Sequence, residues 1–269
     1  RVQNSAYADG LRKIMAQSID ISCRQEEGYL QSELPPKAIA KPHGEKIVVG
    51  YQGVPGAYSH LALQKYFAGA QVEEHNYTLF EDVAQAVKEG EVAYGLLPIE
   101  NSSTGGITEV YDLVRRYDCH IVGEKCVKIE HNLLAYPGTS LDKITEVYSH
   151  PQGFAQCRPF FKQYPKMAQI PYFNTAKGAE LVSIRKTDYM AAVAGRQAAE
   201  LYGLEILASN INANTNNYTR FFVIASEMQE IPNADKITLV VSLKHEPGSL
   251  YNMLGNFYQN NVSEEISFD

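Results

Sequence analysis

The sequence lacks the features that mark secreted, membrane-spanning and nucleic-acid-binding proteins. Its four cysteines show no CxxC spacing, no hydrophobic stretch is long enough to span a membrane, and no run is rich in lysine and arginine. The formal net charge is −7, because 31 Asp and Glu outnumber 24 Lys and Arg. These absences argue against a nucleic-acid partner and an anionic membrane surface, and they predict a cytoplasmic protein with reduced thiols.

Signatures of several common enzyme classes are also missing. No HExxH or paired His–Cys spacing indicates a metal site, no GxGxxG indicates a dinucleotide site, and no GK[ST] ending indicates a phosphate-binding loop. Ser149 precedes His150, but neighbours on an extended strand point to opposite faces and are poorly placed to share a proton. Because a GxSxG motif is absent as well, a serine hydrolase is disfavoured.

The apolar pattern divides the chain into four stretches. Residues 1–32 form a predicted amphipathic helix, and residues 33–46 carry three prolines without an apolar period, which is typical of a linker. From residue 47 short apolar runs alternate with helical segments, so we expect an α/β domain with a parallel or mostly parallel sheet. Residues 235–269 predict one strand and one helix, which cannot bury a core by themselves.

Four loops that follow strand ends are rich in glycine and small polar residues. They occupy residues 50–60, 98–107, 148–154 and 172–180. The helices that begin near Ser59 and after residues 101–104 present N–H groups that attract a carboxylate. The same residues could instead form ordinary polar turns, with Ser59 as a helix N-cap. A fifth stretch, NNYTRFFVI at residues 216–224, places a hydroxyl and a guanidinium directly before a predicted buried strand.

Five motifs, in this order, resemble those of the prephenate dehydratase family. They are GVPGAYSHLA, LLPIENSSTGGI, YSHPQGFAQC, NTAKGAELV and NNYTRFFVI. The family converts prephenate to phenylpyruvate in phenylalanine biosynthesis. The segment KITLVVSLKHEPGSLYNMLGNF is similar to the start of an ACT regulatory domain, although the second ACT signature, Glu-Ser-Arg-Pro, is absent. Residues 1–32 are similar to the last helix of an AroQ-type chorismate mutase, as in bifunctional mutase–dehydratases.

The resemblance implies a fold and a domain organisation. It implies a two-lobed α/β catalytic domain at residues 47–228 that is like a type II periplasmic binding protein, with the active site in the cleft. Lobe one would comprise residues 47–123 plus 211–228, and lobe two residues 124–210. An incomplete α+β ACT domain would follow at residues 235–269. The resemblance also implies a homodimer or homotetramer, with L-phenylalanine as an effector and without a cofactor or metal.

The resemblance further implies roles for individual residues. Thr219 would donate a hydrogen bond to the leaving hydroxyl, and Arg220 would bind a substrate carboxylate through a two-pronged contact. A structural ion pair at the mouth of the strand is the alternative for Arg220. Phenylalanine would bind at Gly248, Ser249 and Leu250. The remaining substrate-binding candidates are Ala57, Tyr58, Ser59, Asn101, Ser102, Ser149, Gln152, Asn174, Thr175, Ala176 and Phe221.

Two other functions stay open on the sequence. Arogenate dehydratase performs the same chemistry on the amino analogue of prephenate, and a non-catalytic solute receptor could use the same two-lobed fold. Chorismate mutase activity is not expected from the N-terminal helix alone, because Arg1, Arg12 and Lys13 are too few cations to enclose a dianionic substrate.

Overall fold

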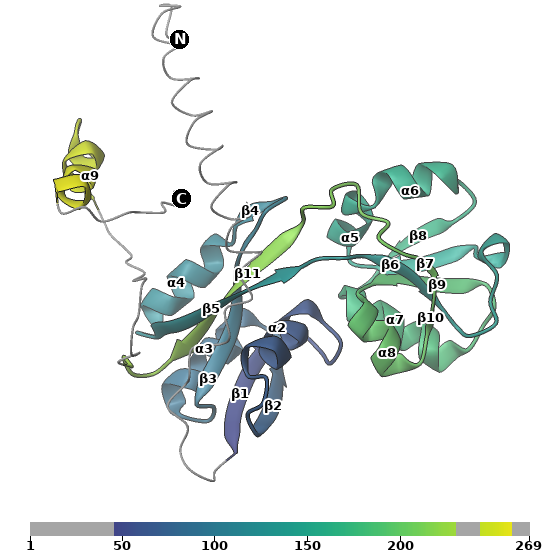
Figure 1. Cartoon of the computed structure of the whole chain (residues 1–269), viewed down its shortest axis with the longest axis horizontal. Helices are drawn as coiled ribbons and strands as arrows, with labels where there is room; N and C mark the ends of the chain where they lie inside the picture. Colours follow the sequence, from purple (N-terminus) through teal and green to yellow (C-terminus); the bar gives the residue numbers. More distant parts are fainter. Residues whose placement is uncertain (1–45, 230–242, 260–269) are drawn as a thin grey trace, which may run out of the picture. The chain divides into compact units, whose positions relative to one another are not determined.

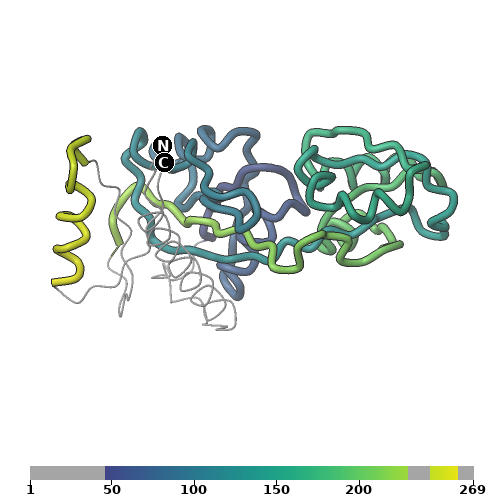
Figure 2. The backbone as a smooth tube through the Cα atoms, turned by 90° about the horizontal axis from the view of Figure 1, so that it is seen from above, coloured from purple at the N-terminus to yellow at the C-terminus, as the bar shows by residue number. Residues whose placement is uncertain are grey.

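The computed structural model describes residues 46–229 and 243–259. Residues 46–229 belong to one compact unit, and helix α9 (Ser249–Gln259) belongs to a second. The first unit contains two β-sheets in separate lobes, which two chain segments connect (Figure 1, Figure 2). In the described ranges no helix combines the length and the apolar composition that crossing a membrane requires.

The first sheet is mixed and has the strand order β2-β1-β3-β11-β5, with the short strand β4 paired to the end of β3. Strand β1 runs parallel to β2 and β3, whereas β11 runs antiparallel to both β3 and β5. The bounds are β1 (Ile47–Gln52), β2 (Val72–Tyr77), β3 (Tyr94–Asn101), β4 (Gly105–Gly106), β5 (His120–Lys128) and β11 (Tyr218–Ala225).

Two apolar clusters cover opposite faces of this sheet. Phe221 belongs to the cluster that contains residues of α2, and Phe222 belongs to the cluster that contains residues of α3 and α4. Side chains of β11 therefore alternate between the faces, as a strand requires. Because both faces are covered, the strand is an almost continuous apolar run. The helices are α2 (Tyr58–Tyr66), α3 (Phe80–Glu89) and α4 (Thr108–Arg116).

The second sheet is also mixed, with the order β10-β6-β9-β7-β8. Strand β7 is parallel to β8 and β9, and β6 is antiparallel to β9 and β10. Its strands are β6 (Asn132–Ala135), β7 (Glu146–Ser149), β8 (Ala168–Pro171), β9 (Met190–Ala194) and β10 (Glu205–Ala208). Its helices are the 3₁₀ turn η1 (Leu141–Lys143), α5 (Pro151–Gln156), α6 (Arg158–Gln163), α7 (Thr175–Arg185) and α8 (Arg196–Tyr202).

The predicted two-lobed α/β fold is confirmed, but neither sheet is mostly parallel. Strands β2, β6 and β10 have short polar or mixed sequences that give little periodic signal, so the apolar pattern does not predict them. Strand β5 stays paired with β11 up to Lys128, so the first sheet extends beyond residue 123, the expected limit of lobe one. The expectations for residues 1–32, most of the 33–46 linker, and residues 230–242 and 260–269 fall outside the described residues.

Candidate active site

Thr219 lies at the start of β11, next to a bulge in β3. Strand β11 pairs with β5 in unbroken register from Tyr218 to Val223, whereas its pairing with β3 skips Ile99. The extra residue in β3 brings Asn101 onto the face of the sheet that Thr219 occupies, directly opposite it. Bulges are frequent beside active sites because they redirect a side chain in this way.

Asn101 is the centre of a buried polar network around Thr219. Its Nδ2 lies 2.9 Å from Thr219 Oγ1, 2.9 Å from Asn217 Oδ1 and 3.0 Å from the Tyr218 carbonyl oxygen. Its Oδ1 accepts the Ser103 backbone N–H at 3.0 Å. Because a backbone N–H can only donate, this bond fixes the orientation of the amide. Asn101 Nδ2 is therefore the donor to the Thr219, Asn217 and Tyr218 oxygens, which share its two hydrogens. The Thr219 hydroxyl thus accepts one hydrogen bond and keeps its own proton for another acceptor.

Ser102 connects the same loop to the residues before Thr219. Its hydroxyl accepts the Tyr218 N–H at 2.9 Å and donates to the Asn216 carbonyl oxygen at 3.0 Å. Phe221, by contrast, is buried in the apolar cluster with α2 and is 2% exposed. Ser102 therefore holds the polar end of β11 in place, while Phe221 anchors the strand in the core.

Arg220 leaves β11 on the face opposite to Thr219, since side chains alternate along a strand. Its Nη2 lies 2.6 Å from Glu100 Oε2, and its Nη1 lies 3.9 Å from Glu124 Oε2. The ion pair that the sequence left open for Arg220 is therefore present. In this structure the side chains of Thr219 and Arg220 do not converge on one point.

The N-terminus of α2 carries three further candidates. Ala57 is the N-cap residue, so Ser59 lies inside the helix, where its buried hydroxyl donates to the Gln52 carbonyl oxygen. The Tyr58 hydroxyl donates to the Glu130 carbonyl oxygen at 2.9 Å. Burial raises the pKa of Tyr58 well above its usual range, so this phenol stays protonated. The alternative that Ser59 is the N-cap of α2 is therefore wrong. Tyr58 connects α2 to the segment between the lobes.

That connection continues through His131 into the second lobe. His131 Nδ1 lies 3.2 Å from the Tyr58 hydroxyl, and its Nε2 lies 2.8 Å from Gln156 Oε1. The ring is almost fully buried, and burial lowers the pKa of His131. The neutral imidazole thus links α2 of the first lobe to α5 of the second.

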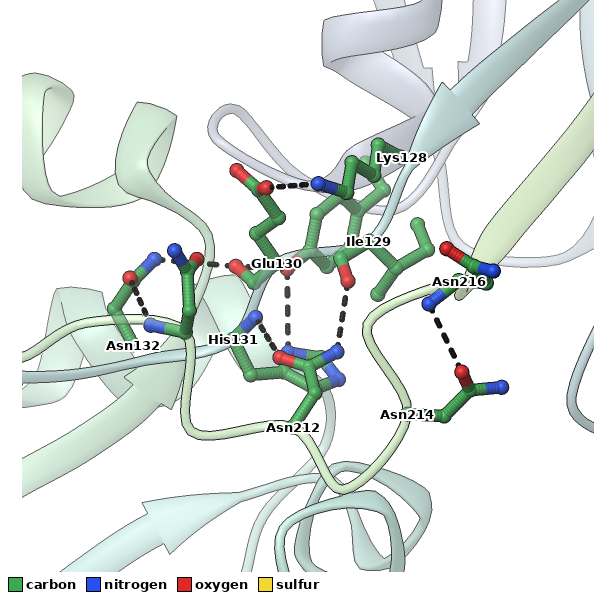
Figure 3. A network of polar contacts seen from close by, with 10 residues as sticks. Lys128, Ile129, Glu130, His131, Asn132, Asn212, Asn214 and Asn216 are labelled. Carbon is green, nitrogen blue, oxygen red and sulfur yellow. Dashed lines mark hydrogen bonds and ion pairs between the residues drawn. The ribbon is translucent and has the colours of Figure 1, made fainter. Parts of the chain in front are cut away.

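Two chain segments cross between the lobes side by side. The outgoing segment contains Ile129 and His131, and the returning one contains Ile211 and Asn217; they are joined by Ile129 N–H to Asn217 O at 2.7 Å and Ile211 N–H to His131 O at 2.9 Å. Figure 3 shows the Asn212 side chain between the segments, where it accepts the His131 N–H at 2.6 Å and donates to the Ile129 carbonyl at 2.7 Å. A side-chain amide therefore replaces part of a backbone ladder at the crossing.

The candidates in the second lobe lie at or just after the carboxyl ends of β7 and β8. Ser149 is fully buried, and its hydroxyl donates to the Val193 carbonyl oxygen at 2.8 Å. Gln152 donates through Nε2 to Thr104 Oγ1 of the first lobe at 3.2 Å. Asn174 is the N-cap of α7; Thr175 and the buried Ala176 are the first helical residues.

An open hollow of about 330 Å³ lies beside these residues. It is lined by His150, Pro151, Pro171, Tyr172 and Phe173, and Phe173 is 83% exposed. The N-terminal ends of α5 and α7 adjoin it, because Pro151 begins α5 and Phe173 comes directly before the N-cap of α7. This edge of the second sheet thus combines helix N-termini with an apolar surface.

The structure brings some sequence candidates together and separates others. Thr219, Asn101 and Ser102 share one network, whereas Ser149, Ala176 and Phe221 are used in packing. Sequence reasoning overlooked the residues that support this network and the crossings. The asparagine-rich run before Tyr218 was a signal for three of these residues, Asn210, Asn212 and Asn217. The overlooked residues are Glu100, His131, Gln156, Asn210, Asn212 and Asn217.

Gly248, Ser249 and Leu250 lie at the beginning of α9. Gly248 has a φ of 88°, a left-handed conformation that favours glycine, and Ser249 is the first helical residue. Leu250 is 37% exposed. The strand expected before this turn lies outside the described residues.

The remaining titratable and thiol groups give no sign of a further centre in the part of the chain that is described. No three His, Cys, Asp or Glu side chains lie together there as metal ligands would. Cys119, Cys126 and Cys157 form no disulfide bond with one another. Burial raises the pKa of the Cys157 thiol to about 12, so it stays protonated.

Two mixed sheets, two crossings and a polar network at the strand end beside them define a two-lobed α/β protein. A family model described as prephenate dehydratase matches residues 49–229, and the chain belongs to this family. Arogenate dehydratase 5 of Arabidopsis thaliana, a chloroplastic protein, is 39% identical over 230 residues, covering 83% of this chain and 53% of the relative. The bifunctional chorismate mutase/prephenate dehydratase of Stutzerimonas stutzeri is 36% identical over 218 residues, covering 80% and 58%. The chain thus spans little more than half the length of these relatives.

Solved structures show the same fold. The prephenate dehydratase of Arthrobacter aurescens in complex with L-Phe matches with a TM-score of 0.69 and 26% identity, covering 82% of this chain and 74% of that one. A protein described as GqqA, a novel type of quorum quenching acylase, matches with a TM-score of 0.66 and 28% identity, covering 82% of both chains.

Proposed function

We propose that this chain catalyses the decarboxylating dehydration of prephenate to phenylpyruvate. The observation that carries the proposal is the hydrogen bond from Asn101 to Thr219. A hydroxyl that already accepts this bond has its proton directed to a different acceptor. The leaving hydroxyl of the substrate is such an acceptor.

The chemistry needs positioning more than a strong acid. Prephenate carries two carboxylates and a ring hydroxyl, and loss of carbon dioxide and water makes the ring aromatic. The free energy gained by forming the aromatic ring drives the reaction without a cofactor. A threonine is a poor acid, but a positioned donor stabilises the charge that develops on the departing oxygen. Thr219 has this role in the proposal.

Helix N-termini are suited to the substrate carboxylates. The first N–H groups of α2 and α7 have no partner within their own helices, and an N-terminus attracts an anion. Ala57, Tyr58 and Ser59 would contribute from α2, and Asn174 and Thr175 from α7. Their placement at helix starts supports a role in binding.

Arg220 is proposed to bind one of the two substrate carboxylates. Its guanidinium has five donors in a planar fork, a geometry that suits a two-pronged contact to a carboxylate. To make this contact, the substrate carboxylate would compete with Glu100 and Glu124, which pair with Arg220 in this structure. The substrate would have to reach Arg220 on the face of β11 opposite to Thr219, or the loop would have to rearrange on binding.

The domain limits stay part of the proposal. Residues 47–228 would form the catalytic domain, and residues 235–269 would belong to an ACT domain, in which Gly248, Ser249 and Leu250 bind L-phenylalanine at a homodimer or homotetramer interface. Residues 1–32 would correspond to the last helix of a chorismate mutase. A cytoplasmic location rests on the cysteine usage alone.

Arogenate dehydratase is the second candidate, because relatives at 39% identity carry that name. The two substrates differ at one side-chain group, so the same network serves both. Acylase activity is not favoured, because the hydroxyl of Ser149 is committed to the Val193 carbonyl and the neighbouring His150 serves as the N-cap of α5. A receptor function remains the outcome if substrate binds without turnover.

Separate incubations with prephenate and with arogenate test the proposal. Phenylpyruvate from prephenate, or phenylalanine from arogenate, should form faster than in a reaction without protein. Binding of either compound in calorimetry without formation of product would instead identify a receptor. The absence of both binding and product would refute the proposal. Adding L-phenylalanine should lower turnover, with a coupling of roughly 1–3 kcal/mol between effector and substrate; unchanged turnover at saturating phenylalanine would remove the effector from the proposal.

A further inference from the structure

The turn that precedes α2 is held by a histidine from inside that helix. Gly53 and Gly56 have φ values of 111° and 83°, which favour glycine. The Gly56 N–H donates to His60 Nδ1 at 3.0 Å. His60 is only 8% exposed, and its ring stacks on Tyr51 with the ring centres 5.2 Å apart. The side chain therefore reaches back over one helical turn to the backbone before the helix.

This contact fixes the tautomer of His60. A backbone N–H donates to Nδ1, so Nδ1 is unprotonated and the ring hydrogen is on Nε2. Nε2 lies 2.7 Å from Glu74 Oε2 on β2, and the amide of Gln64 lies 3.1 Å from the same nitrogen. His60 thus connects the turn to β2 through its two ring nitrogens, each with a different function.

The same turn touches the second lobe. The Pro55 carbonyl oxygen accepts the Tyr202 hydroxyl of α8 at 2.9 Å. A Cβ atom on Gly56 would lie 3.3 Å from Ala198 Cα, so the backbone of the turn packs closely on α8. Any shift of the turn therefore moves the N-terminus of α2 and the contact between the lobes together.

We propose that His60 is a positioning residue for substrate binding. It acts through the Gly56 N–H, which sets the path of the turn and so the direction of the first N–H groups of α2. This role rests on the proposed function, because those N–H groups are the ones assigned to a substrate carboxylate. The effect should fall on the ground-state affinity for an anion and therefore on KM more than on kcat.

Two amide variants separate the contacts of the two ring nitrogens. In His60→Asn, Oδ1 takes the place of Nδ1 and can still accept the Gly56 N–H, whereas the contact to Glu74 is lost. In His60→Gln, the amide reaches the place of Nε2 and can still meet Glu74, whereas Gly56 loses its acceptor. A role in general stability predicts similar losses in both variants. The positioning role predicts different KM values.

We expect His60→Gln to raise KM for prephenate roughly tenfold, the loss of about one hydrogen bond, with kcat changed less than about threefold. His60→Asn should keep KM within about threefold of the wild type, which is within half of one such bond. Exchange of the Gly56 amide hydrogen should accelerate in His60→Gln and not in His60→Asn. The control His75→Gln changes a histidine that makes an exposed contact with Glu73, and it should leave KM unchanged.

The outcomes separate the two proposals. Wild-type protein that converts neither prephenate nor arogenate overturns the proposed function, and the positioning role with it. Wild-type turnover with equal KM values in His60→Gln and His60→Asn overturns only the role of His60. If His60→Gln does not fold, His60→Leu removes the acceptor of the Gly56 N–H with an apolar side chain instead; it should raise KM in the same direction, and an unchanged KM would refute the role.

Discussion

Replacing Thr219 with valine removes the proposed donor while keeping the size and branching of the side chain. The Thr219 hydroxyl is buried, and its oxygen accepts from Asn101 Nδ2 at 2.9 Å. In Thr219→Val the Asn101 amide retains acceptors in Asn217 Oδ1 and the Tyr218 carbonyl. The folded state should therefore lose about 1 kcal/mol, the net value of one hydrogen bond, and the variant should remain folded.

The catalytic loss should be much larger than the loss of stability. Removing one positioned donor to a developing negative charge typically costs about 10²–10³-fold in kcat, or roughly 2.7–4 kcal/mol. Thr219 faces an oxygen that becomes charged only as its bond breaks, so KM should change little. Thr219→Ser keeps the hydroxyl and loses a methyl group and some restriction of χ1, so it should retain much of the activity.

Steady-state formation of phenylpyruvate from prephenate measures these effects, with thermal unfolding measured in parallel. Thr139→Val makes the same change at a buried threonine of the second lobe and should leave kcat unchanged. A kcat for Thr219→Val within about threefold of the wild type would refute the reasoning, because it would leave less than 1 kcal/mol for a donor expected to contribute several times more. The donor to the leaving hydroxyl would then have to be sought among Ser59, Asn101, Ser102 and Thr175.

Three further predictions test other parts of the structure. Arg220→Gln should raise KM for prephenate by roughly 10- to 100-fold if Arg220 binds a substrate carboxylate, whereas Glu100→Gln should leave KM unchanged. If both variants lose the same thermal stability and keep the wild-type KM, Arg220 serves only in the ion pair with Glu100. Gly95→Ala places a Cβ atom 2.7 Å from Val83 Cγ1 and should lower the free energy of unfolding by about 1–3 kcal/mol in denaturant titrations. An unfolding midpoint equal to that of the wild type would contradict this, because it would show that the neighbouring residues move to accommodate the methyl group. Burial lowers the pKa of His131, so below about pH 6.5 the unfolded state binds a proton that the folded state does not. The free energy of unfolding should therefore fall with falling pH in that range, and His131→Gln should flatten this dependence. Identical curves of stability against pH for the two proteins would contradict the expectation.

Much of the fold could be predicted from local patterns. The apolar run from Phe221 to Ala225 is a buried strand in the structure, because aromatic and β-branched residues favour a strand that is covered on both faces. The strand–helix alternation gives the α/β class for the same reason. The direction of each strand could not be predicted, because a strand returning from a second lobe has the same sequence pattern as one that follows a helix.

The sequence by itself determined which residue types stand together: two glycines before α2, the Asn-Ser-Ser-Thr run at the end of β3, and a threonine and an arginine at the start of β11. Only the tertiary structure decided their contacts. The bond between Asn101 and Thr219 joins residues 118 positions apart and depends on a bulge at Ile99. The pairing of Arg220 with Glu100 depends on the same register. Since a shift of one residue moves a side chain to the other face of a sheet, the register, which long-range packing sets, decides which of these groups meet.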